Sequence, residues 1–122
     1  MNKGKACFKD NCFEVDLAVS LGEKEKGLMF KSEMDINRGM LFVYDKEGIY
    51  SFWMKNTMIP LDIIWINAES EVVYINTDTQ PCEVEKCLSV NPEKNAKYVL
   101  EINAGMADKI GLKVGDKLDL NF

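Results

Sequence analysis

The chain has 122 residues, which fits one domain because single domains most often contain roughly 100–150 residues. Its composition, 47% hydrophobic and 29% charged, is that of an ordinary globular protein and excludes a disordered chain. The net charge of −5, with Arg38 as the single arginine, argues against nucleic-acid binding, which requires a cluster of basic side chains on the phosphates.

The first third of the chain predicts a β-hairpin followed by a short helix. Residues 6–19 are expected to form two strands around a tight turn at residues 9–11. Ser20 and Glu23 have the spacing of a capping box, in which the hydroxyl and the carboxylate each satisfy a free backbone amide of the first helical turn. A helix over residues 21–30 follows from this signal.

Strands dominate the middle of the chain. Apolar runs bounded by turn-forming residues predict strands at 40–44, 49–54, 61–67 and 71–77. The 49–54 run carries apolar bulk on both faces, with Phe52 on one face and Trp53 on the other. It is therefore expected to be a central strand, covered on both sides.

The last third contains a long polar segment and three further elements. Residues 77–96 include two prolines and two cysteines, and irregular segments longer than about 12–15 residues are often functional or mobile. A strand at 97–103, a helix at 104–110 that ends at Gly111, and a final strand at 118–120 are expected after it.

Together these elements predict a mostly β fold, α+β by count, in a single domain over residues 1–122. Seven or eight strands with two short helices are typical of a closed or nearly closed antiparallel β-barrel, or of a sandwich. No internal repeat is present, and we expect a monomer.

Several absences narrow the function. No apolar run approaches the roughly 18 residues of a membrane helix. Residues 1–8 lack the apolar stretch of a secretory signal, so we expect either a cytoplasmic protein or an exported one whose signal is absent from this sequence. Histidine, the commonest acid–base group near neutral pH and the commonest metal ligand, does not occur. We therefore expect no cofactor and no metal, and a binding domain more than an enzyme.

The four cysteines fall into two pairs with four residues between the members of each, Cys7 with Cys12 and Cys82 with Cys87. If the first turn centres on residues 9–10, Cys7 and Cys12 lie opposite one another with Cα atoms about 4.5 Å apart, within reach of a disulfide. We expect two disulfides, which favour an extracytoplasmic or hyperthermophilic setting. Free thiols, or one zinc site made by all four thiolates, are the alternatives.

Several short motifs make the chain recognisable. They are Gly27-Leu28-Met29, Gly39-Met40-Leu41-Phe42, Phe52-Trp53-Met54-Lys55-Asn56-Thr57, Pro60-Leu61-Asp62, Tyr98-Val99-Leu100-Glu101, Ala104-Gly105, Gly111 and Gly115-Asp116. From about Val15 to Leu120 the chain resembles the domain-of-unknown-function 192 family of small prokaryotic proteins. The resemblance implies one β-rich domain with short helices, often exported in relatives, with no established activity. Relatives usually carry an arginine where this chain has Lys31, which makes Lys31 a candidate ligand contact, although lysine lacks the planar bidentate geometry of arginine.

Small polar residues near the most specific motif are further candidate ligand contacts. Asn56 and Thr57 follow the predicted 49–54 strand, and Asp62 begins the next one. The three side chains could converge as a hydrogen-bonding site at one end of the barrel. Alternatively, they satisfy backbone amides in turns, as such residues commonly do.

Asp62 and Glu101 are the best carboxylate pair for acid–base chemistry. Both are expected to point into otherwise apolar faces, where burial raises the pKa of a carboxyl group and lets it act as a proton donor. The alternatives are structural pairing with Arg38, Lys31 or Lys55, and ligand recognition.

The leading hypothesis is a non-catalytic binding or accessory domain for a small polar or saccharide-like ligand. Core packing explains the aromatic and methionine residues around Trp53, but an exposed Trp53 face would indicate a binding groove, because aromatic faces stack on sugars. The alternatives are a hydrolase-like enzyme that uses Asp62 and Glu101, and a protein-interaction module that presents residues 77–96.

Overall fold

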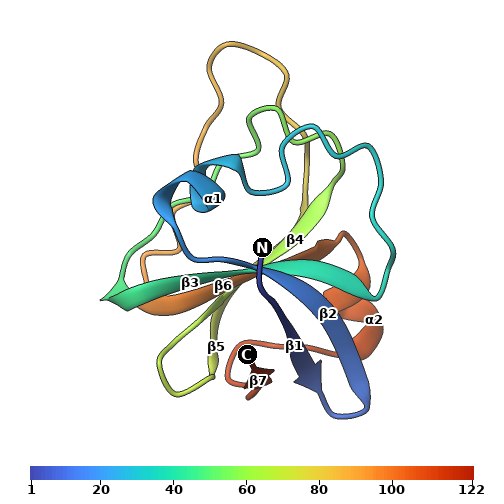
Figure 1. Cartoon of the computed structure of the whole chain (residues 1–122), viewed down its shortest axis with the longest axis vertical. Helices are drawn as coiled ribbons and strands as arrows, with labels where there is room; N and C mark the ends of the chain where they lie inside the picture. Colours follow the sequence, from blue (N-terminus) through green and yellow to red (C-terminus); the bar gives the residue numbers. More distant parts are fainter.

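The computed structural model describes residues 1–122 as seven strands in one mixed sheet with two short helices (Figure 1). In chain order the elements are β1 (Lys3–Phe8), β2 (Asn11–Ala18), α1 (Leu21–Lys26), β3 (Arg38–Gly48), β4 (Leu61–Ile66), β5 (Val72–Thr79), β6 (Ala96–Asn103), α2 (Met106–Ile110) and β7 (Asp119–Asn121). The strand order across the sheet is β5-β4-β6-β3-β2-β1-β7. Neither helix is long and apolar enough to cross a membrane.

The local signals of the N-terminal third are confirmed. β1 and β2 pair around a two-residue turn that places Cys7 opposite Cys12. The capping box at the start of α1 is complete, since the Ser20 hydroxyl accepts a hydrogen bond from the Glu23 amide and the Glu23 carboxylate accepts one from the Ser20 amide. Interactions between residues close in sequence therefore define this part of the chain.

The helix α1 ends at Lys26, earlier than predicted. Gly27 takes a φ of 48°, which residues with a side chain rarely adopt. A Cβ atom at this position would also lie 3.3 Å from the Phe42 ring, so the chain passes close over β3 here. The glycine thus ends the helix and brings the following residues onto the sheet.

The expected antiparallel barrel is corrected on two points. β2 and β3 pair in parallel, with Asp16 opposite Met40, and the sheet is not closed, since β5 and β7 remain its edges. Neighbouring parallel strands need a long crossover connection, and residues 19–37, which include α1, supply it. The two edge regions approach one another through an isolated bridge between Glu71 and Lys117.

The prediction of a central strand at 49–54 is wrong. β3 continues to Gly48, beyond the end predicted at residue 44, and the 49–54 segment carries only an isolated bridge between Phe52 and Val90. The strands that flank it in the sequence cannot pair with it, because β3 already lies between β2 and β6, and β4 between β5 and β6. The strand covered on both faces is β4, all of whose residues are buried.

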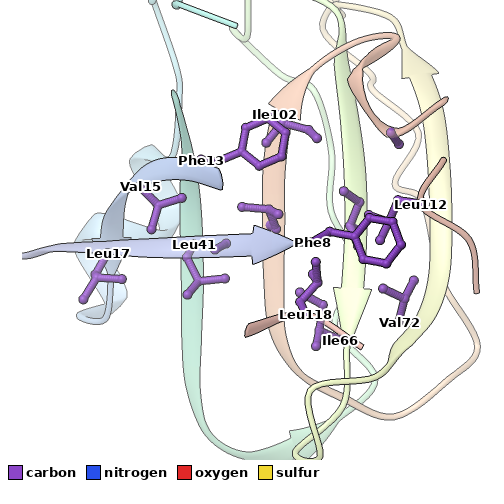
Figure 2. Packing of buried hydrophobic residues seen from close by; sticks show 14 residues of the cluster. Phe8, Phe13, Val15, Leu17, Leu41, Ile66, Val72, Ile102, Leu112 and Leu118 are labelled. Carbon is purple, nitrogen blue, oxygen red and sulfur yellow. The ribbon is translucent and has the colours of Figure 1, made fainter. Parts of the chain in front are cut away.

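Each face of the sheet carries its own hydrophobic cluster, and successive residues of β4 alternate between them. The first cluster includes Ile64 and lies among the β1–β2 hairpin, α2 and the C-terminal segment, and Figure 2 shows Phe8, Ile66 and Leu118 within it. The second includes Ile63 and is covered by residues outside the sheet: Leu28, Met54 and Ile59. In Figure 1, α1 and the long loop after β5 lie above β3 and β6, whereas α2 and β7 lie below these two strands.

Candidate functional site

The face of the sheet that carries α1 also carries a cleft of about 370 Å³. A volume of this size is in the range of small-molecule sites, about 300–1,000 Å³. We call it the Glu101 cleft, and its lining residues are Lys24, Glu25, Lys26, Gly27, Leu28, Met29, Phe42, Tyr44, Ser51, Phe52, Trp53, Lys55, Thr57, Ser89 and Glu101. The wall thus combines α1 and the turn after it with β3, β6 and the irregular 51–57 segment.

Glu101 is the buried polar group of the cleft. It pairs with Met40 of β3 and Ile63 of β4, so its side chain lies on the face of the second hydrophobic cluster. The residue is only 4% exposed. No group of the chain hydrogen-bonds to its carboxyl group, yet no fully buried polar side-chain atom lacks a partner, so the carboxyl oxygens reach the cleft.

Burial raises the pKa of Glu101 to about 8, because the charged form is penalised in an apolar environment. At neutral pH the side chain is therefore mostly a neutral carboxylic acid. In that form it can donate one hydrogen bond and accept others, which suits it to a ligand oxygen.

Aromatic rings form one wall of the cleft. The Phe52 ring packs edge-to-face against Phe42, with centroids 4.8 Å apart, and against Trp65 at 5.8 Å. The indole N–H of Trp65 donates a hydrogen bond of 2.8 Å to the Tyr50 carbonyl, which holds the chain just before Phe52. Trp53 is 48% exposed and lines the cleft. A partly exposed aromatic side chain thus lines the same cleft as Glu101.

Tyr44 projects from β3 and contacts Lys24 of α1. Its ring stacks on Tyr50, with centroids 3.6 Å apart, and the Lys24 ammonium group is 4.1 Å from its ring centroid. Burial, followed by the nearby Tyr50 and Glu101, raises the pKa of Tyr44 to about 12. The phenol is therefore neutral throughout the physiological range, and its ring serves as a stacking group.

The loop between β5 and β6 supports the 51–57 wall. Both predicted disulfides are present, Cys7–Cys12 in the hairpin and Cys82–Cys87 in this loop, and no cysteine is free. The Cys82 amide donates to the Met54 carbonyl, and the Asn56 amide donates to the Cys82 carbonyl, each at 3.2 Å. The Lys55 ammonium group donates a 2.7 Å hydrogen bond to the Val84 carbonyl. Loop and wall are therefore one hydrogen-bonded unit.

Replacing both Cys82 and Cys87 by serine is expected to lower the free energy of unfolding by roughly 2 kcal/mol, the chain-entropy estimate for so small a ring. Without this disulfide, the loop should hold its hydrogen bonds to the 51–57 segment less firmly. Hydrogen exchange at the Asn56 and Phe52 amides should therefore accelerate. Urea denaturation and hydrogen exchange measure the two effects.

The matched control replaces Cys7 and Cys12, whose disulfide has the same sequence separation of 5. It should cost similar stability without faster exchange at Asn56 and Phe52. Equal acceleration in both double variants would show that the loop does not support the wall.

Asp62 lies on the other face of the sheet from Glu101. It pairs with Ile102 of β6, a member of the first hydrophobic cluster, and is completely buried. Its carboxylate accepts hydrogen bonds from the backbone amides of Asp78 at 2.9 Å, Gly105 at 3.1 Å and Ala107 at 2.9 Å. The structure therefore does not bring the two carboxyl groups of the predicted acid–base pair together.

Of the other candidate ligand contacts, some line the Glu101 cleft and others lie outside it. Thr57 is buried and lines the cleft with Trp53 and Glu101, so these three are brought together. Asn56 does not line it; with a φ of 57°, it forms a turn whose carbonyl accepts a hydrogen bond from the Phe30 amide at 2.8 Å. Lys31 is exposed and lies outside the cleft.

Several cleft residues were not among the candidates. Phe42 and Tyr44 alternate with Met40 along β3, which pairs with Glu101, so the strand pattern alone could have placed them on the Glu101 face. Ser51, Ser89 and the lysines of α1 carry no comparable signal, because their position depends on how irregular segments fold over the sheet.

Comparison with known proteins gives a family but no activity. The model of the DUF192 family, described as uncharacterized ACR, matches residues 5–120. Among curated proteins, none is similar enough to this chain to count as a match.

Two solved structures share the fold over almost the whole chain. A protein from Sinorhizobium meliloti, proposed to be a transcription regulator, is 30% identical with a TM-score of 0.84, covering 97% of this chain and 92% of its own. A protein of unknown function from Novosphingobium aromaticivorans is 34% identical with a TM-score of 0.83, covering 96% of this chain and 83% of its own.

Proposed function

This chain belongs to the DUF192 family, and on that premise we propose that it binds a small polar, saccharide-like ligand in the Glu101 cleft without transforming it. The observation that carries the proposal is a buried carboxyl group that reaches the cleft and has no partner within the chain. A ligand that fills the cleft must hydrogen-bond to this group, because leaving it unsatisfied under the ligand would cost about 1–3 kcal/mol.

The neighbouring side chains suit a ligand with an apolar face and hydroxyl groups. The exposed Trp53 ring offers a stacking surface, and Ser51, Thr57 and Ser89 offer hydroxyl groups along the same cleft. Sugars combine these two requirements, because their C–H faces pack on aromatic rings while their hydroxyl groups form hydrogen bonds.

Binding without chemistry is the better account of the carboxyl groups. Glycoside hydrolysis uses two carboxyl groups on one site, about 5–10 Å apart. Here Asp62 faces the opposite side of the sheet and is occupied by three backbone amides. Glu101 therefore acts alone in this proposal, as a recognition group.

The other two candidate functions receive less support. The loop after β5 exposes Val84 and Leu88, as an interaction module would. Its hydrogen bonds, however, join it to the 51–57 wall of the cleft. The regulator description belongs to the Sinorhizobium protein. For this chain, a net charge of −5 with one arginine disfavours DNA contact.

Titration with a panel of monosaccharides and disaccharides, followed by amide NMR shifts, tests the proposal. We expect shifts at residues 51–57 and at Glu101. Replacing Trp53 by alanine should weaken binding at least about tenfold, since an aromatic stacking surface is lost. Tryptophan fluorescence gives a second reading, because the other tryptophan, Trp65, is completely buried.

The control for this variant is Phe122→Ala, which removes an exposed aromatic ring packed on Tyr98, away from the cleft. It should leave binding unchanged. Absence of shifts along the cleft with every member of the panel, or equal affinity of the Trp53→Ala variant, would contradict the proposed function.

A further inference from the structure

The side chains that line the Glu101 cleft carry a net positive charge, whereas the whole chain carries a net negative charge. The chain carries 20 acidic and 15 basic residues, yet three lysines line this cleft against one exposed acidic residue, Glu25. The lysines are Lys24, Lys26 and Lys55. A cleft that concentrates one sign of charge attracts ligands of the opposite sign.

Two of these lysines are held in place. The Lys24 ammonium group lies 4.1 Å from the Tyr44 ring centroid, and the Lys55 ammonium group donates hydrogen bonds to the carbonyls of Val84 and Glu85 at 2.7 and 3.4 Å. Neither forms an ion pair with a carboxylate. Their positive charges therefore stay beside the cleft and are not neutralised within the chain.

Glu101 does not offset this charge near neutral pH. Its pKa is raised to about 8 by burial, so the group is mostly protonated at pH 7. The other titratable groups lining the cleft are Lys24, Glu25, Lys26, Tyr44 and Lys55. With Tyr44 neutral, the three lysines outweigh the single charge of Glu25.

We infer that the ligand of the Glu101 cleft is an acidic sugar, whose carboxylate or phosphate lies among Lys24, Lys26 and Lys55 while a hydroxyl or ring oxygen accepts a hydrogen bond from Glu101. This inference rests on the proposed function and narrows its ligand class. A neutral sugar would leave the three lysines uncompensated, and a cation would be repelled by them.

Calorimetric titration with three probes, glucose, glucuronate and glucose 6-phosphate, tests the ligand class. At low salt we expect at least one acidic probe to bind about fivefold or more tighter than glucose, with the difference shrinking as salt screens the lysines. The affinity of that probe should fall as the pH rises from 7 to 9, because Glu101 becomes an anion. The Glu101→Gln variant should lose this pH dependence.

Lysine variants measure how much the positive charge at the cleft contributes to binding of the acidic probe. Lys26→Gln should weaken binding of the acidic probe about two- to threefold, the effect of one exposed charge, and so reduce the preference of the cleft for the acidic probe over glucose. Lys31→Gln, which removes an exposed lysine outside the cleft, is the matched control and should change neither.

The outcomes distinguish this inference from the proposal on which it rests. Equal affinities for glucose and both acidic probes, or a Lys26→Gln variant with unchanged preference, would overturn the acidic-ligand inference while leaving saccharide binding in place. Failure of all three probes to bind in the cleft would overturn the inference, and failure of the whole sugar panel would overturn the proposed function as well.

Discussion

Replacing Asp62 by alanine is expected to destabilise the folded protein by about 3–5 kcal/mol, enough to unfold a marginally stable domain. The carboxylate is completely buried and accepts hydrogen bonds from three backbone amides. Hydrogen bonds to a charged group contribute about 1.5–3 kcal/mol each, and the variant leaves all three donors without a partner. Urea denaturation, followed by circular dichroism, measures the loss.

The size of this effect follows from what Asp62 connects. The amide of Asp78 belongs to β5, whereas those of Gly105 and Ala107 belong to the first turn of α2. The cap residue of α2, Gly105, has no side chain to satisfy these donors. Asp62 therefore caps α2 from β4 and ties the helix to the sheet.

Asp108→Ala is the control for this prediction, because Asp108 lines the same cavity as Asp62 but is exposed. It should cost less than about 1 kcal/mol. A loss for Asp62→Ala no larger than that of the control would show that the three hydrogen bonds contribute little.

The second large effect is a free energy of unfolding that falls as the pH rises from about 4.5 to about 8. The pKa of Glu101 is raised from 4.5 to about 8 by burial, so in this window the folded state keeps a proton that the unfolded state has released. Raising the pH therefore favours unfolding, by up to about 1.4 kcal/mol per pH unit and roughly 3–5 kcal/mol in all. Above pH 8 the effect should level off.

The shifted pKa of Glu23 does not produce this trend. The backbone amides of Ser20 and Val19 lower the pKa of Glu23. Its contribution therefore has the opposite sign, being present at higher pH and lost as the pH falls below about 4.5. The decline between pH 4.5 and 8 thus identifies Glu101.

The Glu101→Gln variant makes the attribution specific. Glutamine has a similar shape but cannot ionise, so at pH 8 the variant should be about 3 kcal/mol more stable than the parent, with a flatter pH dependence. Glu25→Gln, at the rim of the same cleft, should leave the pH dependence unchanged. Stability of the parent that stays level or rises between pH 5 and 8 would refute this account of Glu101.

A gain in stability at Glu101 would also bear on function. A buried acid that lowers stability at the working pH, with no partner in the chain, is what a binding site retains for its ligand. The Glu101→Gln result and the sugar titrations therefore test one site by two independent readings, folding and binding.

The predictions that succeeded depend on residues close together in sequence. The hairpin turn, the capping box of Ser20 and Glu23, and the Cys7–Cys12 pair each follow from spacings of a few residues. The helix end at Gly111 is also confirmed, with its φ of 74°. Local geometry decides these features, whatever the rest of the chain does.

The features that failed depend on which strands become neighbours. The parallel pairing of β2 with β3 has no signal in the local sequence. Whether the sheet closes into a barrel or stays open has none either. Residues 49–54 have the composition of a buried strand, but the strands that flank them in the sequence, β3 and β4, each already have two neighbours. The segment covers the second cluster instead, through Phe52 and Met54. Tertiary context thus overrode a good strand pattern.

The candidate site was predictable in its residue types and not in its arrangement. Polar residues set among apolar strand positions correctly marked Asp62 and Glu101 as buried. Alternation along β4 and β6 places Ile63 opposite Glu101 and Ile102 opposite Asp62, so the register separates the carboxyl groups onto two faces. That register is a property of strand pairing and could not be obtained from either strand alone.

The pairing of β7 with β1 has a consequence for synthesis on the ribosome. β1 is made before β7, residues 119–121, and every other strand of the sheet is made between them, yet the two lie side by side, with Ala6 opposite Leu120. The outer edge of the hairpin therefore stays unpaired until all the other strands of the sheet have been made. During that interval it is an unpaired strand edge, the kind of surface on which nascent chains associate and chaperones act.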